Sequence, residues 1–254
     1  MLQVHQFACL EDNYGYLIRD DVTGEAAAID APDAARILSE IDRMGWRLTQ
    51  VLCTHWHTDH TGGVAALKAA TGARIVGPCE VRRKSALEQE IGDGAVVAAG
   101  ETWLDVLATP GHTAQHVCYV TRDRTAAFVG DTLFALGCGR VFEGSMMQMW
   151  DSLCRLAALP GETLIYCAHE YTEANAAFAV TVDRSPATAA RAAAVAAARA
   201  RGEWTVPSRL ATEIATNPFL RAPALRPDLT PAEAFATLRK AKDQFQPPDP
   251  PQRN

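Results

Sequence analysis

The segment Thr54-His55-Trp56-His57-Thr58-Asp59-His60 places three imidazoles and a carboxylate in neighbouring positions, directly after the apolar run 51–53. In an extended segment His55 and His57 can point to one side, whereas Asp59 and His60 lie beyond the bend. Imidazole nitrogen and carboxylate oxygen are ligands for zinc, iron and manganese. A single histidine is usually structural, but three at this spacing indicate a metal-binding loop.

Three further candidate ligands follow apolar runs in the same way. They are His112 after the predicted strand 104–108, Asp131 after 126–129 and His169 after 164–167. Loops at the ends of strands on a rigid scaffold are common places for functional sites. Seven ligands are too many for one tetrahedral ion and suit two ions that share a carboxylate. His5 and His116 do not follow this pattern, and we assign them structural roles.

A pair of metal ions would bring hydrolytic chemistry to these loops. Two dications can lower the pKa of a bridging water toward ~7 and so provide hydroxide at neutral pH. The same ions can polarise a carbonyl group and stabilise the oxyanion of a tetrahedral intermediate. The sequence contains no G-x-S-x-G elbow that would supply a separate nucleophile.

The order of predicted elements indicates an α/β domain followed by a small helical one. We expect strands within 4–18 and at 25–29, 51–53, 74–77, 104–108, 117–121, 126–129 and 164–167, and helices at 34–44, 63–70 and 146–158. After about residue 172 only helices are expected, at 174–180, 186–201, 210–216 and 231–243, before an unstructured tail at 246–251. We therefore predict two domains, 1–171 and 172–254.

Composition excludes several classes of protein. With 48% hydrophobic and 21% charged residues, the 254-residue chain is neither disordered nor fibrous. It has no apolar window long enough for a membrane span and no secretory signal, and its seven cysteines form no C-x-x-C pair. We therefore expect a cytoplasmic protein. Residues 1–170 carry 13 Lys and Arg against 22 Asp and Glu, whereas residues 171–254 carry 11 against 8.

The T-H-x-H-x-D-H segment, together with the later His112, Asp131 and His169, resembles the metallo-β-lactamase superfamily. That resemblance implies an αββα sandwich with a binuclear metal site at one edge. Narrower features are similar to one family within it, the hydroxyacylglutathione hydrolases, or glyoxalase II. These features are D-N-Y at 12–14, G-D-T-L-F at 130–134, G-C-G-R-V-F-E-G at 137–144, H-E-Y-T at 169–172, T-V-P-S at 205–208, N-P-F-L-R at 217–221 and K-D-Q-F at 242–245.

The resemblance implies a division of the ligands between two divalent metal ions. It assigns His55, His57 and His112 to the first ion, Asp59, His60 and His169 to the second, and Asp131 to both. Zinc is the first expectation, with iron and manganese as alternatives. The implied reaction is hydrolysis of S-D-lactoylglutathione, or a similar 2-hydroxyacyl thioester, to D-lactate and glutathione, the second step of methylglyoxal detoxification. Asp59 would also be catalytic, because it can orient the attacking hydroxide.

The resemblance also implies glutathione contacts from Arg140, Phe142, Tyr171, Arg239 and Lys242. Glutathione carries two carboxylates, which arginine and lysine are suited to bind. The family often has Lys where Arg140 stands, and Tyr where Phe142 stands. The second difference removes one hydroxyl contact, worth ~1 kcal/mol of binding.

Three alternatives were weighed against this prediction. A mononuclear iron persulfide dioxygenase of the same fold would leave the second ligand set unfilled, but Asp59, His60 and His169 are all present. A phosphodiesterase or nuclease would need a basic catalytic domain, and this one is acidic. A non-catalytic metal-binding regulator would not need seven ligands around an open water site. No heptad or repeat indicates assembly, so we expect a monomer without nucleic-acid or membrane partners.

Overall fold

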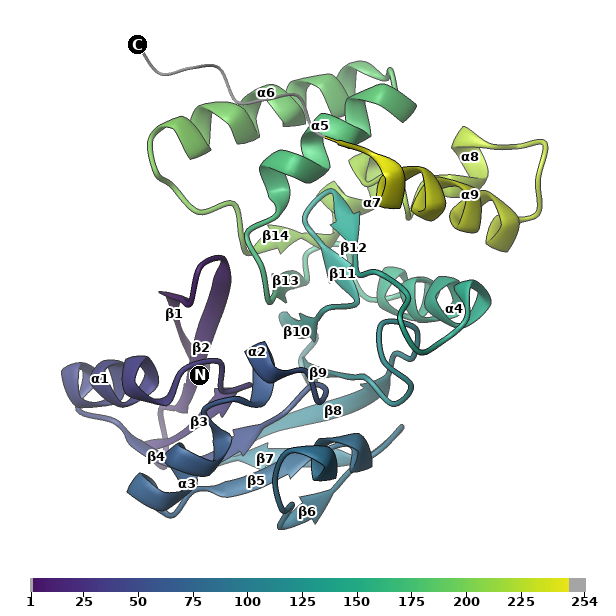
Figure 1. Cartoon of the computed structure of the whole chain (residues 1–254). Coiled ribbons are helices and arrows are strands. Elements are labelled where there is room, and N and C mark those ends of the chain that lie inside the picture. The colour runs from purple at the N-terminus through teal and green to yellow at the C-terminus, as the bar shows by residue number, and fades with distance from the viewer. Residues whose placement is uncertain (1, 247–254) are drawn as a thin grey trace.

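Two six-stranded sheets form the centre of the computed structural model, which describes residues 2–246 (Figure 1). The first sheet contains, in spatial order, β1 (Leu2–Cys9), β2 (Asn13–Asp20), β3 (Glu25–Ile29), β4 (Arg47–Leu52), β5 (Arg74–Gly77) and β6 (Gln89–Glu90). The second contains β14 (Ser208–Arg209), β13 (Leu164–Cys167), β10 (Ala126–Gly130), β9 (Val117–Thr121), β8 (Thr102–Ala108) and β7 (Val96–Ala99). The edge strand β14 pairs antiparallel with β13, so the C-terminal part of the chain completes this sheet.

The main apolar core lies between the two sheets. Leu52 from the first sheet and Leu104, Tyr119 and Phe128 from the second are fully buried in one cluster. Strands β9 and β10 are buried at every position, which is the pattern of strands covered on both faces. This core fixes the ends of the strands, where the candidate ligands begin.

Helices cover the outer faces of both sheets. On the first sheet lie α1 (Ala34–Met44) and α3 (Val64–Thr71), and α4 (Met146–Ala157) joins the core that contains the second sheet. Helix α1 begins at Asp33, whose carboxylate accepts from two backbone N–H groups, and it ends at Gly45, whose φ of 64° is readily adopted by glycine. The predicted αββα sandwich is confirmed.

The rest of the chain is mainly helical and stacks over one end of the sandwich (Figure 1). Its helices are α5 (Thr172–Val182), α6 (Pro186–Ala200), α7 (Leu210–Thr216), α8 (Ala222–Leu225) and α9 (Pro231–Gln244). The predicted C-terminal helices are confirmed to within a few residues, whereas α8, β6, β7 and β14 were not predicted. The predicted tail lies outside the described residues from position 247 on. Within residues 2–246, no helix is both long and apolar enough to span a membrane.

Four short elements complete the fold. They are α2 (Thr58–Thr61), a 3-10 helix at Cys79–Arg83, and the two-stranded hairpin of β11 (Leu133–Phe134) and β12 (Gly137–Cys138). Helix α2 forms directly after the extended segment of His55 and His57, which is the bend expected there.

Candidate metal centre

The candidate ligands lie together where the strands of both sheets end. His55 and His57 follow β4, Asp131 follows β10 and His169 follows β13, while His112 lies in the loop between β8 and β9. Helix α2 supplies the remaining two, Asp59 and His60. All seven side chains belong to groups whose ligand atoms lie within 4.8 Å of one another. Those groups are His55 with His57 and His112, His55 with His60 and Asp131, and Asp59 with His60 and His169.

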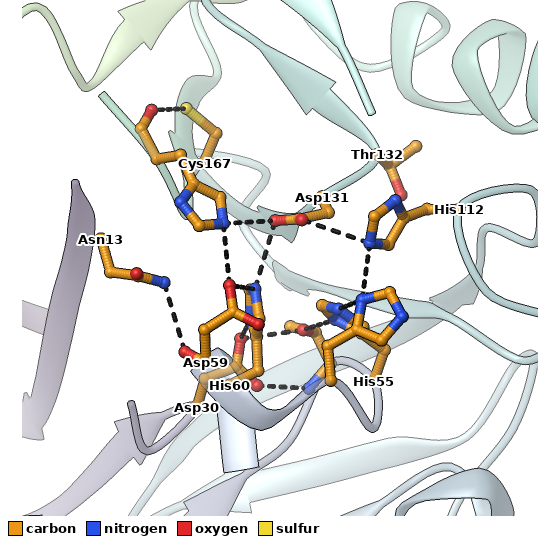
Figure 2. Close-up of polar contacts among 12 residues, drawn as sticks. Asn13, Asp30, His55, Asp59, His60, His112, Asp131, Thr132 and Cys167 are labelled. Atoms are coloured by element: carbon orange, nitrogen blue, oxygen red, sulfur yellow. Dashed lines mark hydrogen bonds and ion pairs between the residues drawn. The ribbon is translucent and has the colours of Figure 1, made fainter. Parts of the chain in front are cut away.

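Asp131 lies between the two outer groups (Figure 2). Its Oδ2 atom is 3.3 Å from Nε2 of His112, which belongs to one group. Its Oδ1 atom is 3.4 Å from Nε2 of His60 and 3.4 Å from Nε2 of His169, which belong to the other. Each carboxylate oxygen therefore faces a different group, as a carboxylate that bridges two ions would.

Two buried atoms at this site fit a metal ion. Within residues 2–246, Nε2 of His60 and Oδ1 of Asp131 are buried and have no hydrogen-bond partner. Leaving a buried polar atom without a partner is costly, so native proteins rarely do it. A divalent cation accepts electron pairs from exactly such nitrogen and oxygen atoms.

Other groups orient four of the five candidate histidine rings so that Nε2 faces the centre, whereas His57 presents Nδ1 to His55 and His112. The Nδ1 contacts are His60 to Asp30 Oδ2 at 2.8 Å, His169 to Asp12 Oδ1 at 2.9 Å, His112 to the Arg140 carbonyl at 2.9 Å, and His55 to Thr54 Oγ1 at 3.0 Å. Partners of this kind fix the tautomer and the ring orientation of metal-binding histidines. The arrangement thus has the outer contacts of a metal centre as well as the ligands.

Asp30 is a functional residue that the sequence analysis missed. It accepts hydrogen bonds from both the backbone N–H and the hydroxyl of Thr54, at 2.7 and 2.8 Å, and it also contacts His60. Its φ of 59° is unusual for a residue other than glycine. The available signal was its position, because Asp30 directly follows a strand just as the candidate ligands do.

His116, which was assigned a structural role, is fully buried beside the candidate ligands. Its Nε2 accepts a hydrogen bond from the backbone N–H of Asp131 at 3.1 Å, and its ring stacks on that of His55 at 4.9 Å. His5 lies elsewhere, paired with Glu40 at 2.8 Å. The contact with Asp131 gives His116 a part in shaping the site.

Burial and neighbouring charges move the pKa values of several candidate ligands away from their ordinary values. Burial, reinforced by the nearby His60 and His116, lowers the pKa of His55, so its imidazole is neutral at pH 7. Burial opposes ionisation of Asp131, but His169 and His60 hold its pKa well below the usual value. The neutral imidazole of His55 and the ionised carboxylate of Asp131 are in the forms that bind metals. Burial opposes protonation of His60 and His169, but the nearby carboxylates raise the pKa of His60, and they raise that of His169 to about 10, so these two rings would release their protons when a metal ion binds.

A cavity of about 510 Å³ extends from the candidate ligands to the C-terminal helices. One part of its wall contains His57, Asp59, His112, Asp131 and His169. Another part contains all five residues predicted to contact the substrate, Arg140, Phe142, Tyr171, Arg239 and Lys242. The structure therefore brings both predicted sets of residues to one cavity.

Two aromatic rings cover candidate ligands at the cavity wall. Tyr171 stacks parallel to His169, with 4.7 Å between ring centroids. Phe142 is 61% exposed and its ring lies 5.3 Å from that of His112 and 5.9 Å from that of His57. These rings form apolar surface next to the place where a reacting group would bind.

The three cationic residues differ in how free they are to bind an anion. Arg239 is buried, and its guanidinium donates to the Cys138 carbonyl at 2.8 Å and to Asp243 at 2.9 Å. Arg140 is exposed, 3.8 Å from the same Asp243. Lys242 donates to a backbone carbonyl at 2.9 Å. Burial and the nearby Arg239 and Arg140 lower the pKa of Lys242 to about 8.

Comparison with known families agrees with this geometry. Residues 21–169 match the model of the metallo-β-lactamase superfamily, and residues 170–245 match that of the hydroxyacylglutathione hydrolase C-terminus. The chain belongs to the hydroxyacylglutathione hydrolase family. It is 52% identical over 253 residues to a protein of that name from Maricaulis maris, covering 96% of this chain and 99% of the relative. A second, from Erythrobacter litoralis, is 49% identical over 251 residues, covering 96% and 100%.

Solved structures resemble this member of the hydroxyacylglutathione hydrolase family in fold. ETHE1 from Myxococcus xanthus superposes with a TM-score of 0.72 at 28% identity, covering 96% of this chain and 93% of that one. TTHA1623, solved in a di-iron-bound form, has a TM-score of 0.56 at 25% identity, covering 66% and 91%. TTHA1623 thus aligns with only part of this chain, whereas ETHE1 aligns with nearly all of it.

Proposed function

We propose that this chain is a metal-dependent thioesterase that hydrolyses S-D-lactoylglutathione, or a related 2-hydroxyacylglutathione, to the 2-hydroxy acid and glutathione. The observation that carries the proposal is the shared cavity, which joins metal-type ligands to Arg140, Arg239 and Lys242. The names of the relatives and the match to the family's C-terminal region support it. Such a reaction would be the second step of methylglyoxal detoxification.

We further propose that the site holds two divalent ions, zinc first, with iron or manganese as alternatives. His55, His57 and His112 would hold one ion, Asp59, His60 and His169 the other, and Asp131 both. The di-iron form of TTHA1623 supports a pair of ions. When bound, such ions lower the pKa of water and act as Lewis acids toward a carbonyl oxygen.

Asp59 is the proposed catalytic side chain among these ligands. Its carboxylate is 42% exposed, and Oδ2 lies 3.4 Å from Nε2 of His169 and 3.6 Å from Nε2 of His60. Burial opposes its ionisation, but those two rings lower its pKa, so it is a carboxylate at neutral pH. An ionised oxygen at the cavity wall can accept a hydrogen bond from the attacking water and orient it toward the thioester carbonyl.

The part of the cavity wall that contains Arg140, Phe142, Tyr171, Arg239 and Lys242 is proposed to bind the glutathione part of the substrate. Arg140 and Lys242 would bind carboxylates of the substrate, and Phe142 and Tyr171 would flank the bound chain. Arg239 would add positive charge and hold the wall through its contacts with Cys138 and Asp243. The leaving group is a thiol of pKa near ~8.5, so its departure needs no strong general acid. In this proposal residues 1–171 bind metal, and 172–254 help to bind glutathione.

The proposed setting is the cytoplasm, with the protein acting as a monomer. All seven cysteines lie within the described residues and are free thiols, five of them buried. Free thiols are usual in a reducing compartment. The surplus of acidic residues in 1–170 does not favour binding to nucleic acid.

Hydrolysis of S-D-lactoylglutathione by the purified protein tests the proposal. Activity should be lost when a chelator removes the metal, and it should return when zinc, iron or manganese is added back. Metal analysis of the active sample should give two ions per chain. A fully metallated protein without turnover would overturn the proposed substrate. Full activity with a single metal ion per chain would overturn the proposal of two ions.

A further inference from the structure

The hairpin of β11 and β12 connects two parts of the metal centre. It begins two residues after Asp131, and the chain leaves it through Gly139 and Arg140. The carbonyl of Arg140 accepts a hydrogen bond from Nδ1 of His112 at 2.9 Å. Figure 1 shows the hairpin extending away from the sheets toward α5 and α7. One short segment therefore touches the centre at its base and the C-terminal helices at its tip.

Side chains at the C-terminal end of α7 hold the backbone of this hairpin. Asn217 donates from Nδ2 to the carbonyls of Phe134, at 3.1 Å, and Gly137, at 2.9 Å. Glu213 accepts from the backbone N–H of Leu136 at 2.9 Å. Asn217 and Glu213 are both fully buried, and they are themselves joined at 3.1 Å.

Two more helices add buried contacts to the same backbone. Asn175 of α5 donates to the carbonyl of Ala135 at 3.1 Å, and Arg239 of α9 donates to that of Cys138 at 2.8 Å. A Cβ atom at position Gly137 would lie 2.3 Å from Asn175, so this close approach requires a glycine. Side chains from three helices thus bind successive backbone groups from residue 134 to 138.

The turn of the hairpin has a conformation that depends on these contacts. Leu136 has a φ of 56°, in the left-handed region that bulky side chains seldom adopt. Its side chain is fully buried against Ala176, Ala179 and Val195 of α5 and α6. Such conformations persist where the surroundings determine them fully, which here means the helices.

At its base the hairpin has no free space. A Cβ atom at Gly139 would lie 1.9 Å from the carbonyl oxygen of Asp131 and 3.2 Å from Nδ1 of His112. The returning strand therefore packs directly against both candidate ligands, and a displaced hairpin would displace them. Interiors packed this closely transmit such shifts.

We propose that Asn175, Glu213 and Asn217 are positioning residues for the metal centre. They fix the hairpin from the C-terminal helices, and the hairpin in turn fixes Asp131 and His112. The inference deepens the proposed function and rests on it, because it requires that Asp131 and His112 bind metal. It gives the C-terminal helices a role in metal binding in addition to any contact with the substrate.

Metal affinity in the variant Asn217→Ala tests this role, measured by competition with a chromogenic zinc chelator. The variant loses both hydrogen bonds to the hairpin, and we expect zinc to bind about 10-fold more weakly, as when outer contacts of metal ligands are removed. The matched control is Arg221→Ala, which breaks a 2.9 Å ion pair between the start of α8 and Asp183 at the end of α5, and Arg221 does not contact the hairpin. The control should bind zinc with the parent's affinity, even if its Tm falls as much as that of Asn217→Ala.

A milder variant keeps the test decisive if Asn217→Ala does not fold. Asn175→Ala removes one hairpin contact and should weaken zinc binding severalfold. If the Asn217 and Asn175 variants have a lowered Tm, as the control has, but bind zinc with the parent's affinity, the positioning role is overturned and the proposed function is not. A parent protein that binds no zinc, iron or manganese would instead overturn the proposed function and this inference with it.

Discussion

The Nε2 atom of His116 accepts a hydrogen bond from the backbone N–H of Asp131, at 3.1 Å. The contact holds the backbone at Asp131, whose carboxylate lies between the two outer groups of candidate ligands. The approach is so close that a Cβ atom at Gly130 would lie 2.7 Å from the same nitrogen. A histidine outside the candidate ligand groups is thereby built into the candidate metal centre.

Replacing His116 with alanine should lower both stability and metal content. The buried N–H of Asp131 would lose its partner, which costs ~1–3 kcal/mol, and the space left by the ring would add to that loss. Urea unfolding and metal analysis measure the two effects. His5→Ala is the control, because His5 lies away from the site and its loss should leave metal content unchanged. A His116 variant with full metal content would contradict the expectation.

Replacing Asp131 with alanine should remove most of the metal and the activity together. Its two oxygens face different groups of ligands, so one substitution weakens both proposed ion sites. Activity should fall by at least about 100-fold, since even outer contacts of metal ligands are worth 10- to 100-fold in affinity or activity. Metal analysis and turnover are measured on one sample. Retention of two ions per chain would contradict the bridging role.

The substitution Phe142→Tyr should strengthen substrate binding. It restores the hydroxyl that the family often has at this position, on a ring that is 61% exposed beside the cavity. One added hydrogen bond of ~1 kcal/mol corresponds to about a fivefold lower KM. We expect kcat to change little, because the added hydroxyl would contact the glutathione part of the substrate and not the thioester carbonyl. An unchanged KM would show that the hydroxyl finds no partner in the complex.

Binding of an anionic ligand should weaken as the pH rises through about 8. The pKa of Lys242 is lowered from 10.5 to about 8 by burial and by Arg239 and Arg140, so its positive charge is present below this pH and lost above it. Titration with S-methylglutathione between pH 6.5 and 9 measures the effect without interference from a free thiol. Lys242→Met should bind more weakly at pH 6.5 and lose this part of the pH dependence. An identical pH profile in both proteins would exclude Lys242 from binding.

Local signals in the sequence were enough to predict an α/β domain and its candidate ligands, whereas the αββα sandwich was implied by the resemblance to the metallo-β-lactamase superfamily. Helix α1 was predicted with its bounds because a spacing of apolar residues and Gly45 define it within eleven positions. The ligands were found because each one follows an apolar run. The same rule applied to Asp30 would have added it, since Asp30 follows β3 in the same way.

The contacts that hold the site together could not be predicted from such signals. Asn217 binds carbonyls that lie 83 and 80 positions away, and nothing near it in the sequence indicates these partners. A glutathione contact was predicted for Arg239, but its hydrogen bonds to the Cys138 carbonyl and to the Asp243 carboxylate were not. Two-residue strands such as β14 exist only because a neighbouring strand is present to pair with them.

The pairing of β14 with β13 limits how this protein can be cut or recombined. If the chain ended after residue 171, Leu164 and Ile165 would lose their partners Arg209 and Ser208, and β13 would become an open sheet edge. Open edges pair with other chains and promote aggregation. A chimera that exchanges the C-terminal helices must therefore also bring a strand to close the sheet beside His169.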